Sequence, residues 1–390
     1  MPSATKNADA RIAAILVAVV GLSSCEKDDM AAPASAAESI VVAYKINANG
    51  ELTPSIPVRL ESLDLGRLEE LRERESLAAI VSEGASEFEQ ILLLKEWVAS
   101  QWPAGTPNPY PPWDAIVVLD WIRQGITGGF CAQYAQVMLQ SLASLGMQAR
   151  YIELGSTVNP YAHFVMEVWS NQFNKWVVID ADYNLHFQRD GIPLSALEVH
   201  DALIRDELAE VSVVLGTRRP GHSEVTLWPF QTAELYYYLR YHLKANHLAA
   251  PLEAPFDRYN DMVEWLDELT VPWELSQVDS SFPKQRLTNL QTADRALVES
   301  RINQVSVAIE SNSAGVIAMT LDNNMHDFRG YEFRLLASPL QDRPWQPHGS
   351  QTLNWRPTRT TRILEVRGVN VSGVAGPTAR LTASLGSPGR

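Results

Sequence analysis

Apolar side chains recur along the chain with different periods, which predicts helices in some stretches and strands in others. A β-branched, apolar run at residues 39–46 predicts a short strand. Residues 65–99 repeat apolar positions at spacings of three or more, which predicts two helices. A further helix is predicted over residues 113–122, directly after a proline-rich stretch. The first part of the ordered body is therefore predicted to be mainly helical.

The segment that begins at Cys131 has the most regular helical period in the chain. It is followed by Gly146, at the place where a helix C-terminus favours glycine. Strand-like runs come next at residues 149–154, 162–169 and 175–180, and a turn-like stretch separates the last two. A helix followed by an antiparallel sheet predicts an α+β fold.

The remainder of the chain has two different patterns of apolar and polar residues. Residues 195–294 have a mostly helical character, and the aromatic cluster at residues 236–241 is typical of core packing. From about residue 303, short alternating runs separated by turn residues predict a small β-sandwich. Within it, residues 364–370 resemble the last hairpin of fibronectin-type or other immunoglobulin-like modules. We therefore expect an immunoglobulin-like β-sandwich at the C-terminus.

The N-terminus has the order of an export signal. A modestly basic start with Lys6 and Arg11 precedes an apolar run at residues 12–20, which is too short to span a bilayer as a mature helix. Small residues then precede Cys25, an order that resembles the lipobox of bacterial lipoproteins, where cleavage precedes a lipid-modified cysteine. An ordinary signal peptide or a short buried segment is the alternative. The polar, Ala/Pro/Ser-rich residues 26–38 are typical of a flexible tether.

Charge, length and the number of cysteines limit which kinds of protein this chain can be. The formal net charge is −14 and no basic face stands out, which argues against a nucleic-acid partner. A chain of 390 residues is too long for one ordinary core and suggests two domains plus a leader. Cys25 and Cys131 have such different contexts that each thiol has its own explanation in place of a shared disulfide.

The loop before the Cys131 helix favours a reactive thiol. Gly128 and Gly129 allow a tight approach of the backbone, and Cys131 falls in the first turn of the predicted helix. The unpaired N–H groups and the positive end of the helix dipole stabilise a thiolate there. The same N–H groups can hold a developing oxyanion. A structural cysteine would more naturally sit inside the helix, so the position favours a nucleophile.

A base and an orienting acid follow on the predicted strands. His163 lies near the start of one strand, and Asp180 closes the next. An acid at the end of an apolar strand can reach across a hairpin and orient the imidazole, which completes a Cys-His-Asp triad. A lone strand histidine is more often a core or surface residue, so this prediction depends on the acid. Asp182 is a rival for that role, and Asp180 is preferred because it follows the apolar strand directly.

These features together resemble the core of the transglutaminase-like superfamily. The matching residues are Gly128-Gly129-Phe130-Cys131, Gln133-Tyr134-Ala135, Leu145-Gly146, His163 with its strand, and the strand that ends at Asp180. The resemblance covers roughly residues 88–200 and implies a papain-like core in which the Cys-bearing helix packs on an antiparallel sheet. One departure is that family members often continue the aspartate with Pro-Thr, whereas Ala181 and Asp182 follow here.

The sequence gives weaker support for the other candidate site residues. Gln124 and Trp121 are candidates for a second oxyanion donor, although Gln124 also fits a solvated residue at a helix end. His186 and His200 are interpreted as surface or packing residues. No group of His, Cys, Asp and Glu has metal-ligand spacing along the sequence, so we expect no metal and no cofactor.

The sequence thus predicts a thiol enzyme of the bacterial envelope with four parts. They are a lipoprotein signal peptide at residues 1–25, a tether at 26–38, a transglutaminase-like domain with helical extensions at 39–295, and a β-sandwich module at 296–390. Lipidated Cys25 would anchor the exported chain to a membrane, on the periplasmic or cell-surface side.

The predicted reaction is attack of Cys131 on an amide or peptide carbonyl, through a thioester intermediate. The expected substrate is a peptide, a protein or a cell-wall peptide. Hydrolysis by a peptidase or amidase is favoured over transfer to an amine, the reaction of a true transglutaminase. A non-catalytic binding or assembly lipoprotein is the rival interpretation, and the oligomeric state stays open.

Overall fold

The chain is described by a computed structural model over residues 40–47, 52, 54–159, 162–217, 232–251, 262–270 and 290–386. Ser39–Arg390 form one compact unit. The predicted signal peptide, the tether and Cys25 lie outside the described residues. Within the described ranges, no helix has the length and apolar character that a membrane crossing needs.

The first helices follow the apolar periodicity closely. They are α1 (Gly66–Arg74), α2 (Leu77–Val81), α3 (Glu87–Ala99), α4 (Ala115–Arg123) and α5 (Cys131–Ser144). The predictions of helices over residues 113–122 and from Cys131 are confirmed by α4 and α5. Residues 65–99 hold three helices where two were predicted. The reason is Ser76, whose left-handed backbone (φ 54°) separates α1 from α2.

These helices pack on a nine-stranded sheet. Its strands follow the order β10-β9-β8-β2-β3-β4-β5-β6, and β7 pairs with β5. The strands are β2 (Ala149–Gly155), β3 (His163–Ser170), β4 (Lys175–Asp180), β5 (Leu185–Arg189), β6 (Ile192–Pro193), β7 (Ser212–Leu215), β8 (Tyr238–His242), β9 (Met262–Trp265) and β10 (Leu290–Thr292). The strands predicted at residues 149–154, 162–169 and 175–180 are confirmed as β2, β3 and β4, which pair antiparallel. The α+β class is therefore confirmed for this part.

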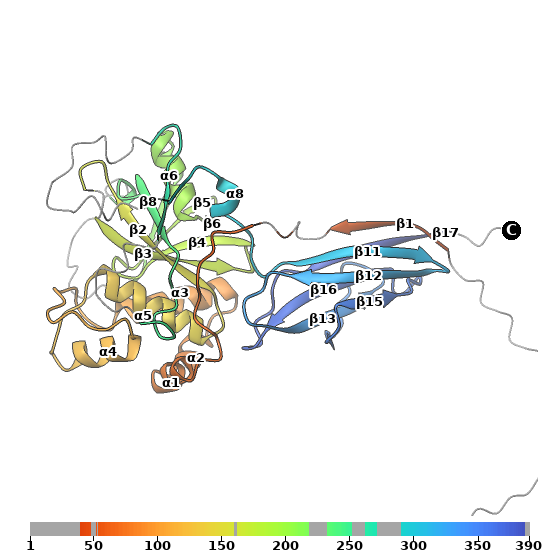
Figure 1. The fold of residues 1–390 in the computed structure, drawn as a ribbon, viewed down its shortest axis with the longest axis horizontal. Helices are drawn as coiled ribbons and strands as arrows, with labels where there is room; N and C mark the ends of the chain where they lie inside the picture. Colours follow the sequence, from red (N-terminus) through yellow and green to blue (C-terminus); the bar gives the residue numbers. More distant parts are fainter. Residues whose placement is uncertain are drawn as a thin grey trace, which may run out of the picture. The chain divides into compact units, whose positions relative to one another are not determined.

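The sheet is covered on both faces. Helices α3, α4 and α5 lie on one side of it, and α6 (Ala196–Ile204) lies on the other (Figure 1). Neighbouring residues of β3 point to opposite faces, so Met166 joins the apolar cluster under α5 while Val165 joins the one under α6. Residues 132–144 of α5 are all buried. The helix that begins with Cys131 is thus the central helix of its layer.

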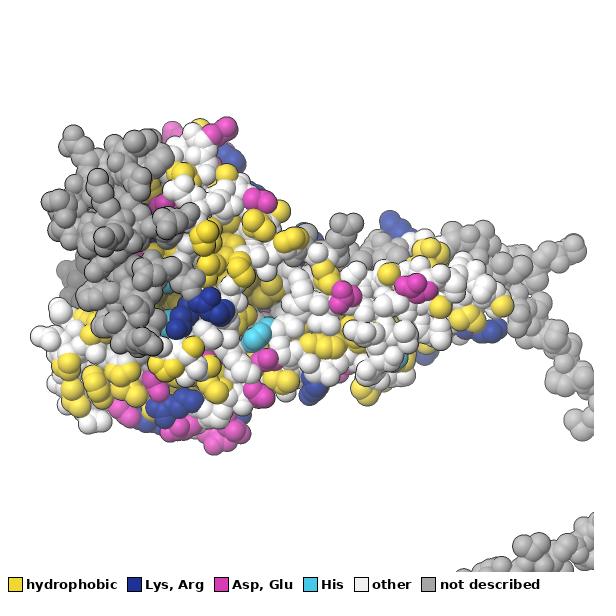
Figure 2. Space-filling model, in the orientation of Figure 1, with side chains coloured by type: hydrophobic (Ala, Val, Ile, Leu, Met, Phe, Trp, Pro, Cys, Tyr) yellow, Lys and Arg dark blue, Asp and Glu magenta, His cyan; other side chains and the backbone are white. Residues whose placement is uncertain are grey.

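The helical layer carries many of its charges as pairs. Arg123 donates hydrogen bonds to Glu75 at 2.8 and 2.9 Å, and Arg67 donates one to Asp114 at 2.8 Å. In the space-filling view, basic and acidic side chains lie intermixed along the lower edge, over these helices (Figure 2). The charges therefore neutralise one another locally on this face.

The prediction of a mostly helical region at residues 195–294 is wrong for most of its described residues. Beyond α6 and a 3-10 turn (Leu208–Glu210), the described elements of this region are the strands β7, β8, β9 and β10. All five residues of β8 are buried, and the face that carries Tyr238 and His242 also carries the ion-paired Arg240. A strand buried on both faces lacks the alternation that identifies strands, and periodicity alone does not distinguish it from a helix.

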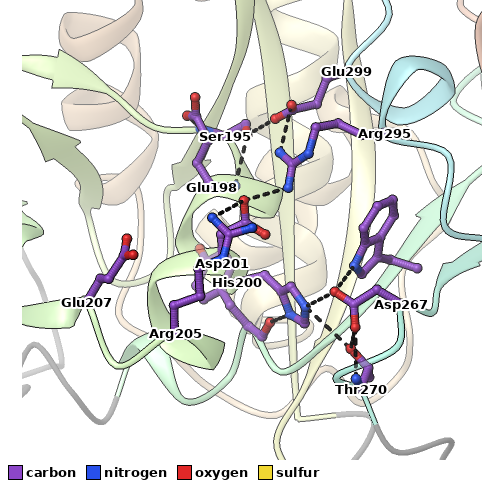
Figure 3. Close-up of polar contacts among 12 residues, drawn as sticks. Ser195, Glu198, His200, Asp201, Arg205, Glu207, Asp267, Thr270, Arg295 and Glu299 are labelled. Atoms are coloured by element: carbon purple, nitrogen blue, oxygen red, sulfur yellow. Dashed lines mark hydrogen bonds and ion pairs between the residues drawn. The ribbon is translucent and has the colours of Figure 1, made fainter.

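Polar contacts tie α6 to the segment at residues 262–270 (Figure 3). His200 is fully buried, and its Nδ1 lies 2.8 Å from the carbonyl oxygen of Tyr236. Its Nε2 lies 3.6 Å from Oδ2 of Asp267, and the other carboxylate oxygen, Oδ1, accepts a 2.7 Å hydrogen bond from the Thr270 hydroxyl. Of the two interpretations of His200, surface or packing, the packing one is therefore confirmed.

The C-terminal part consists of two sheets around a common apolar core. The first has the order β1-β17-β16-β13-β14 and the second the order β11-β12-β15. The strands are β1 (Ile40–Asn47), β11 (Val305–Ser313), β12 (Val316–Asn323), β13 (Phe328–Leu336), β14 (Gln346–His348), β15 (Thr352–Trp355), β16 (Ile363–Asn370) and β17 (Ala379–Gly386). Two sheets agree with the expected all-β module, and its likeness to immunoglobulin domains stays a prediction.

Strand β1, the first described strand, pairs with the last one. The strand predicted at residues 39–46 is present, and it pairs antiparallel with β17, the last strand. It thus belongs to the C-terminal sheets, whereas the predicted domain bounds placed it with the transglutaminase-like part. A strand pattern identifies the element but not its partner, because pairing between the two ends of the chain leaves no local signal.

A buried ion pair links β2, β3 and the start of the C-terminal part. Arg150 of β2 and Glu167 of β3 are almost completely buried and form hydrogen bonds of 2.6 and 2.9 Å. The Arg150 guanidinium also donates to the carbonyl oxygen of Val298 and lies 4.2 Å from the ring centre of Trp176. The second carboxylate oxygen of Glu167 accepts the N–H of Ala196, at the start of α6. The pair thus connects four segments of the chain.

We predict that Arg150→Met lowers the free energy of unfolding by about 3–5 kcal/mol, because it leaves the Glu167 carboxylate buried without its cation. Chemical denaturation monitored by circular dichroism measures this change. The double variant Arg150→Met/Glu167→Gln should lose clearly less than the sum of the two single variants. Arg67→Met is the matched control, because Arg67 is only partly buried and its loss should change stability by about 1 kcal/mol or less. Additive losses in the double variant would contradict the prediction.

Candidate active site

The thiol of Cys131 stands at the first residue of α5, after a tightly packed loop. Phe130, just before the helix, is extended (φ −128°, ψ −163°) and turns the chain into α5. A Cβ atom on Gly128 would lie 2.6 Å from a backbone carbonyl oxygen, and one on Gly129 would lie 2.7 Å from Trp102. Glycine is therefore needed at both positions for this approach. Cys131 is a free, partly exposed cysteine next to the N–H groups that the first turn leaves without intrahelical partners.

His163 and Asp180 meet the thiol from the neighbouring strands. His163 is the first residue of β3 and Asp180 the last residue of β4. The Nε2 atom of His163 lies 2.7 Å from a carboxylate oxygen of Asp180, and both side chains are buried. The sulfur of Cys131 lies within 4.8 Å of a nitrogen of the same ring. Since Asp180 occupies Nε2, Nδ1 is the ring nitrogen left for the thiol.

The electrostatics of this cluster favour a cationic His163. Burial by itself lowers the pKa of His163, but the attraction and hydrogen bond of Asp180 and the hydrogen bond with Cys131 raise it. The net result is a His163 pKa well above its ordinary value.

Two acids approach the cluster, and they take different positions. Asp180 is held on both sides, because one oxygen contacts His163 and the other accepts the Tyr183 N–H at 2.9 Å. The carboxylate of Asp182 lies within 4.8 Å of both the Cys131 sulfur and a ring nitrogen of His163. The acid that accepts the hydrogen bond of the imidazole is thus Asp180, the residue that the strand pattern favoured, and Asp182 lies close to both the sulfur and the ring.

The sequence pattern missed two aromatic residues beside this cluster. The Tyr183 ring stacks on His163 with ring centres 4.6 Å apart, and burial raises the pKa of its hydroxyl. Trp102 stacks on Tyr134 of α5 at 4.3 Å, and its buried indole N–H has no hydrogen-bond partner among the described residues. Tyr183 lies in the turn after β4 and Trp102 in the proline-rich stretch after α3. Neither segment has a periodicity that could have identified these residues.

The remaining candidates lie outside the cluster of Cys131, His163 and Asp180. Gln124 is exposed at the C-terminal end of α4, and Trp121 lies one turn earlier in that helix. Their role as oxyanion donors stays a prediction. His186 is buried and packs edge-on against Phe88 at 5.4 Å, and burial followed by the charge of Lys95 lowers its pKa to about 4. It is a packing residue, one of the two interpretations that the sequence favoured.

Comparison with known proteins finds one family model that covers this cluster. No curated protein matches the chain. Residues 75–181 match the family model of the transglutaminase-like superfamily. The match includes Cys131, His163 and Asp180, and it leaves out the C-terminal sheets. Residues 75–181 are therefore similar to a transglutaminase-like superfamily domain.

Proposed function

We propose that the chain is a cysteine-nucleophile enzyme that acts on amide or peptide bonds through a thioester intermediate. The observation that carries the proposal is the arrangement of the three side chains: the Cys131 sulfur lies within 4.8 Å of a ring nitrogen of His163, and His163 contacts the Asp180 carboxylate at 2.7 Å. A nucleophile, a base and an acid that holds the base are the parts that acyl transfer by a thiol requires. The family match agrees with this use of the cluster.

In the proposed first step, the Cys131 sulfur attacks the carbonyl carbon of the substrate. The negative charge that develops on the carbonyl oxygen is stabilised by N–H groups at the start of α5. His163 then gives its proton to the leaving nitrogen as the carbon–nitrogen bond breaks, and the acyl group stays on Cys131 as a thioester. Asp180 keeps the ring oriented and stabilises its charge in this step.

In the proposed second step, His163 removes a proton from the nucleophile that resolves the thioester. We propose water for this role, so that the products are a carboxylate and an amine and the enzyme is a peptidase or amidase. Water is present at high concentration around a partly exposed thiol, whereas an amine acceptor needs a site of its own. Transfer to an amine is the other outcome that the assay of products distinguishes.

We also propose that lipidated Cys25 anchors this enzyme to a membrane of the cell envelope. The support is the order of basic, apolar and small residues before Cys25. Metabolic labelling with a fatty-acid analogue tests this proposal independently of the chemistry. Label on the wild type that is lost in Cys25→Ser is the expected result, and an unlabelled, fully water-soluble wild type would refute it.

We predict that Cys131 reacts with iodoacetamide at neutral pH at least about ten-fold faster in the wild type than in His163→Asn. His163 lies within 4.8 Å of the sulfur and is the base that a thiol nucleophile needs, so its loss should slow alkylation. Mass spectrometry of the alkylated Cys131 peptide measures the rate. Equal rates in the two proteins would rule out the thiolate–imidazole pair.

A screen of peptides and cell-wall fragments is predicted to reveal cleavage by the wild type and none by Cys131→Ala. Product masses separate the two reactions, since hydrolysis adds one water to the substrate and transfer adds an amine. Cleavage that persists in Cys131→Ala would contradict the proposed nucleophile. A wild type with a reactive thiol and no product in any fragment class would support the binding-protein alternative.

With the substrate from that screen, Asp180→Asn is predicted to lower kcat by about 10³–10⁴-fold, because an amide at this position stabilises the wrong tautomer and cannot balance the charge of the imidazolium. Asp182→Asn should lose much less, since Asp182 does not hold the imidazole. Steady-state kinetics of both purified variants provide the comparison. A larger loss in Asp182→Asn than in Asp180→Asn would exchange the roles of the two acids.

A further inference from the structure

We propose that Cys131, His163 and Asp182 bind a single zinc ion, and that the bound ion holds the enzyme in an inactive state. The inactive state rests on the function proposed above, whereas the metal site does not. The carboxylate oxygen of Asp182, the sulfur of Cys131 and a ring nitrogen of His163 all lie within 4.8 Å of one another. They are the one such group of three or more metal-ligating side chains found among the described residues.

The three side chains offer the ligand types that zinc prefers. Zn²⁺ binds thiolate sulfur, imidazole nitrogen and carboxylate oxygen at about 2.0–2.3 Å, in tetrahedral geometry. Ligand atoms of such a site lie roughly 3.3–3.6 Å apart, as follows from these bond lengths and the tetrahedral angle. The observed separations thus require side-chain movements of about one ångström, within the reach of an Asp182 side chain that leaves a turn.

The outer shell of the site is already in place. Histidines that bind a metal usually donate their other ring N–H to a carboxylate, which fixes the ring and its tautomer. The Nε2 atom of His163 has this contact with Asp180 at 2.7 Å, and Asp180 is itself fixed by the Tyr183 N–H. Nδ1 is then the nitrogen that faces the metal. Asp180 supports the ring in both states of the site, and Asp182 is the ligand.

The position of Asp182 has a clear physical rationale in the metal-bound state. The carboxylate of Asp182 and a thiolate at Cys131 repel each other, because both are negative and lie close together. A divalent cation between the two anions removes this repulsion. The ion binds the electron pairs of the Cys131 sulfur and of the His163 nitrogen, so neither is available as nucleophile or base while zinc is bound.

Three protein ligands leave one position of a tetrahedral zinc open to water or another small ligand. Cys131 is partly exposed, so the ion can reach the site from solvent and leave it again. The structure thus points to a reversible block that a chelator removes. Spacing along the sequence did not predict this group, because its members come from α5, from β3 and from the turn after β4.

Zinc uptake by the full chain tests the proposal. In a Cys25→Ser background, Cys131 is the remaining one of the two cysteines in the sequence. We expect one Zn²⁺ per chain by equilibrium dialysis, and protection of Cys131 from iodoacetamide by ZnCl₂ but not by MgCl₂, because Mg²⁺ prefers oxygen ligands. Replacement of zinc by Co²⁺ should produce a thiolate-to-cobalt charge-transfer band that Cys131→Ser lacks.

Variants of the acids identify the ligand. Asp182→Asn should weaken Zn²⁺ binding by at least about ten-fold, and Asp180→Asn by about 10–100-fold through the outer shell. Asp190→Asn is the matched control with unchanged zinc affinity, because Asp190 is exposed in a turn outside the site. Circular dichroism verifies the fold of each variant, and Asp182→Ser replaces Asp182→Asn if the amide disturbs it.

Each outcome decides one of the two proposals. Absence of zinc protection, or equal zinc affinity in Asp182→Asn and the wild type, would overturn the three-ligand site. A Cys131 that still reacts faster than in His163→Asn would then leave the proposed function standing. If Cys131 binds zinc but is otherwise unreactive, the proposed zinc site stands and the proposed enzymatic function is refuted. Faster substrate turnover with added zinc would overturn the inhibitory role.

Discussion

The burial of α5 against the central strands is the constraint on which the site depends. Residues 132–144 are buried along the whole helix, so α5 cannot shift or rotate without disrupting the apolar cluster beneath it. This rigidity fixes Cys131 at one end of the helix relative to His163 on β3. The crowded glycines before Cys131 then determine how the loop enters the helix.

Strand β3 combines structural and chemical roles. Its first residue, His163, contacts the thiol and Asp180, and its central residue, Glu167, forms the buried ion pair with Arg150. That ion pair also reaches the start of α6 and Val298 near the C-terminal sheets. Because a buried ion pair requires accurate geometry, it holds β2 and β3 in one register and with them the His163 ring.

Asp180 and Asp182 show how two similar acids can differ in chemistry. Asp180 ends a strand and is held by two hydrogen bonds, so its charge serves the His163 ring. Asp182 lies in the following turn, close to the sulfur. In the function that we propose, the cluster with a protonated ring carries out acyl transfer, whereas a divalent cation would use the same sulfur and nitrogen as ligands. Under these proposals, a proton on His163 permits the thiol chemistry and a bound cation blocks it.

The sequence by itself determined the local elements of this site: the helix from Cys131, the strands that carry His163 and Asp180, and the glycines before the thiol. Their signals are local, because they depend on periodicity and backbone conformation within a few residues. Only the tertiary structure decided that β1 pairs with β17, that β8 is a strand, that Tyr183 stacks on His163, that Trp102 packs against Gly129, and that Asp182 lies close to the thiol. Those contacts join residues that are distant in the chain or lie in turns, where no repeating pattern reports which side chain faces which.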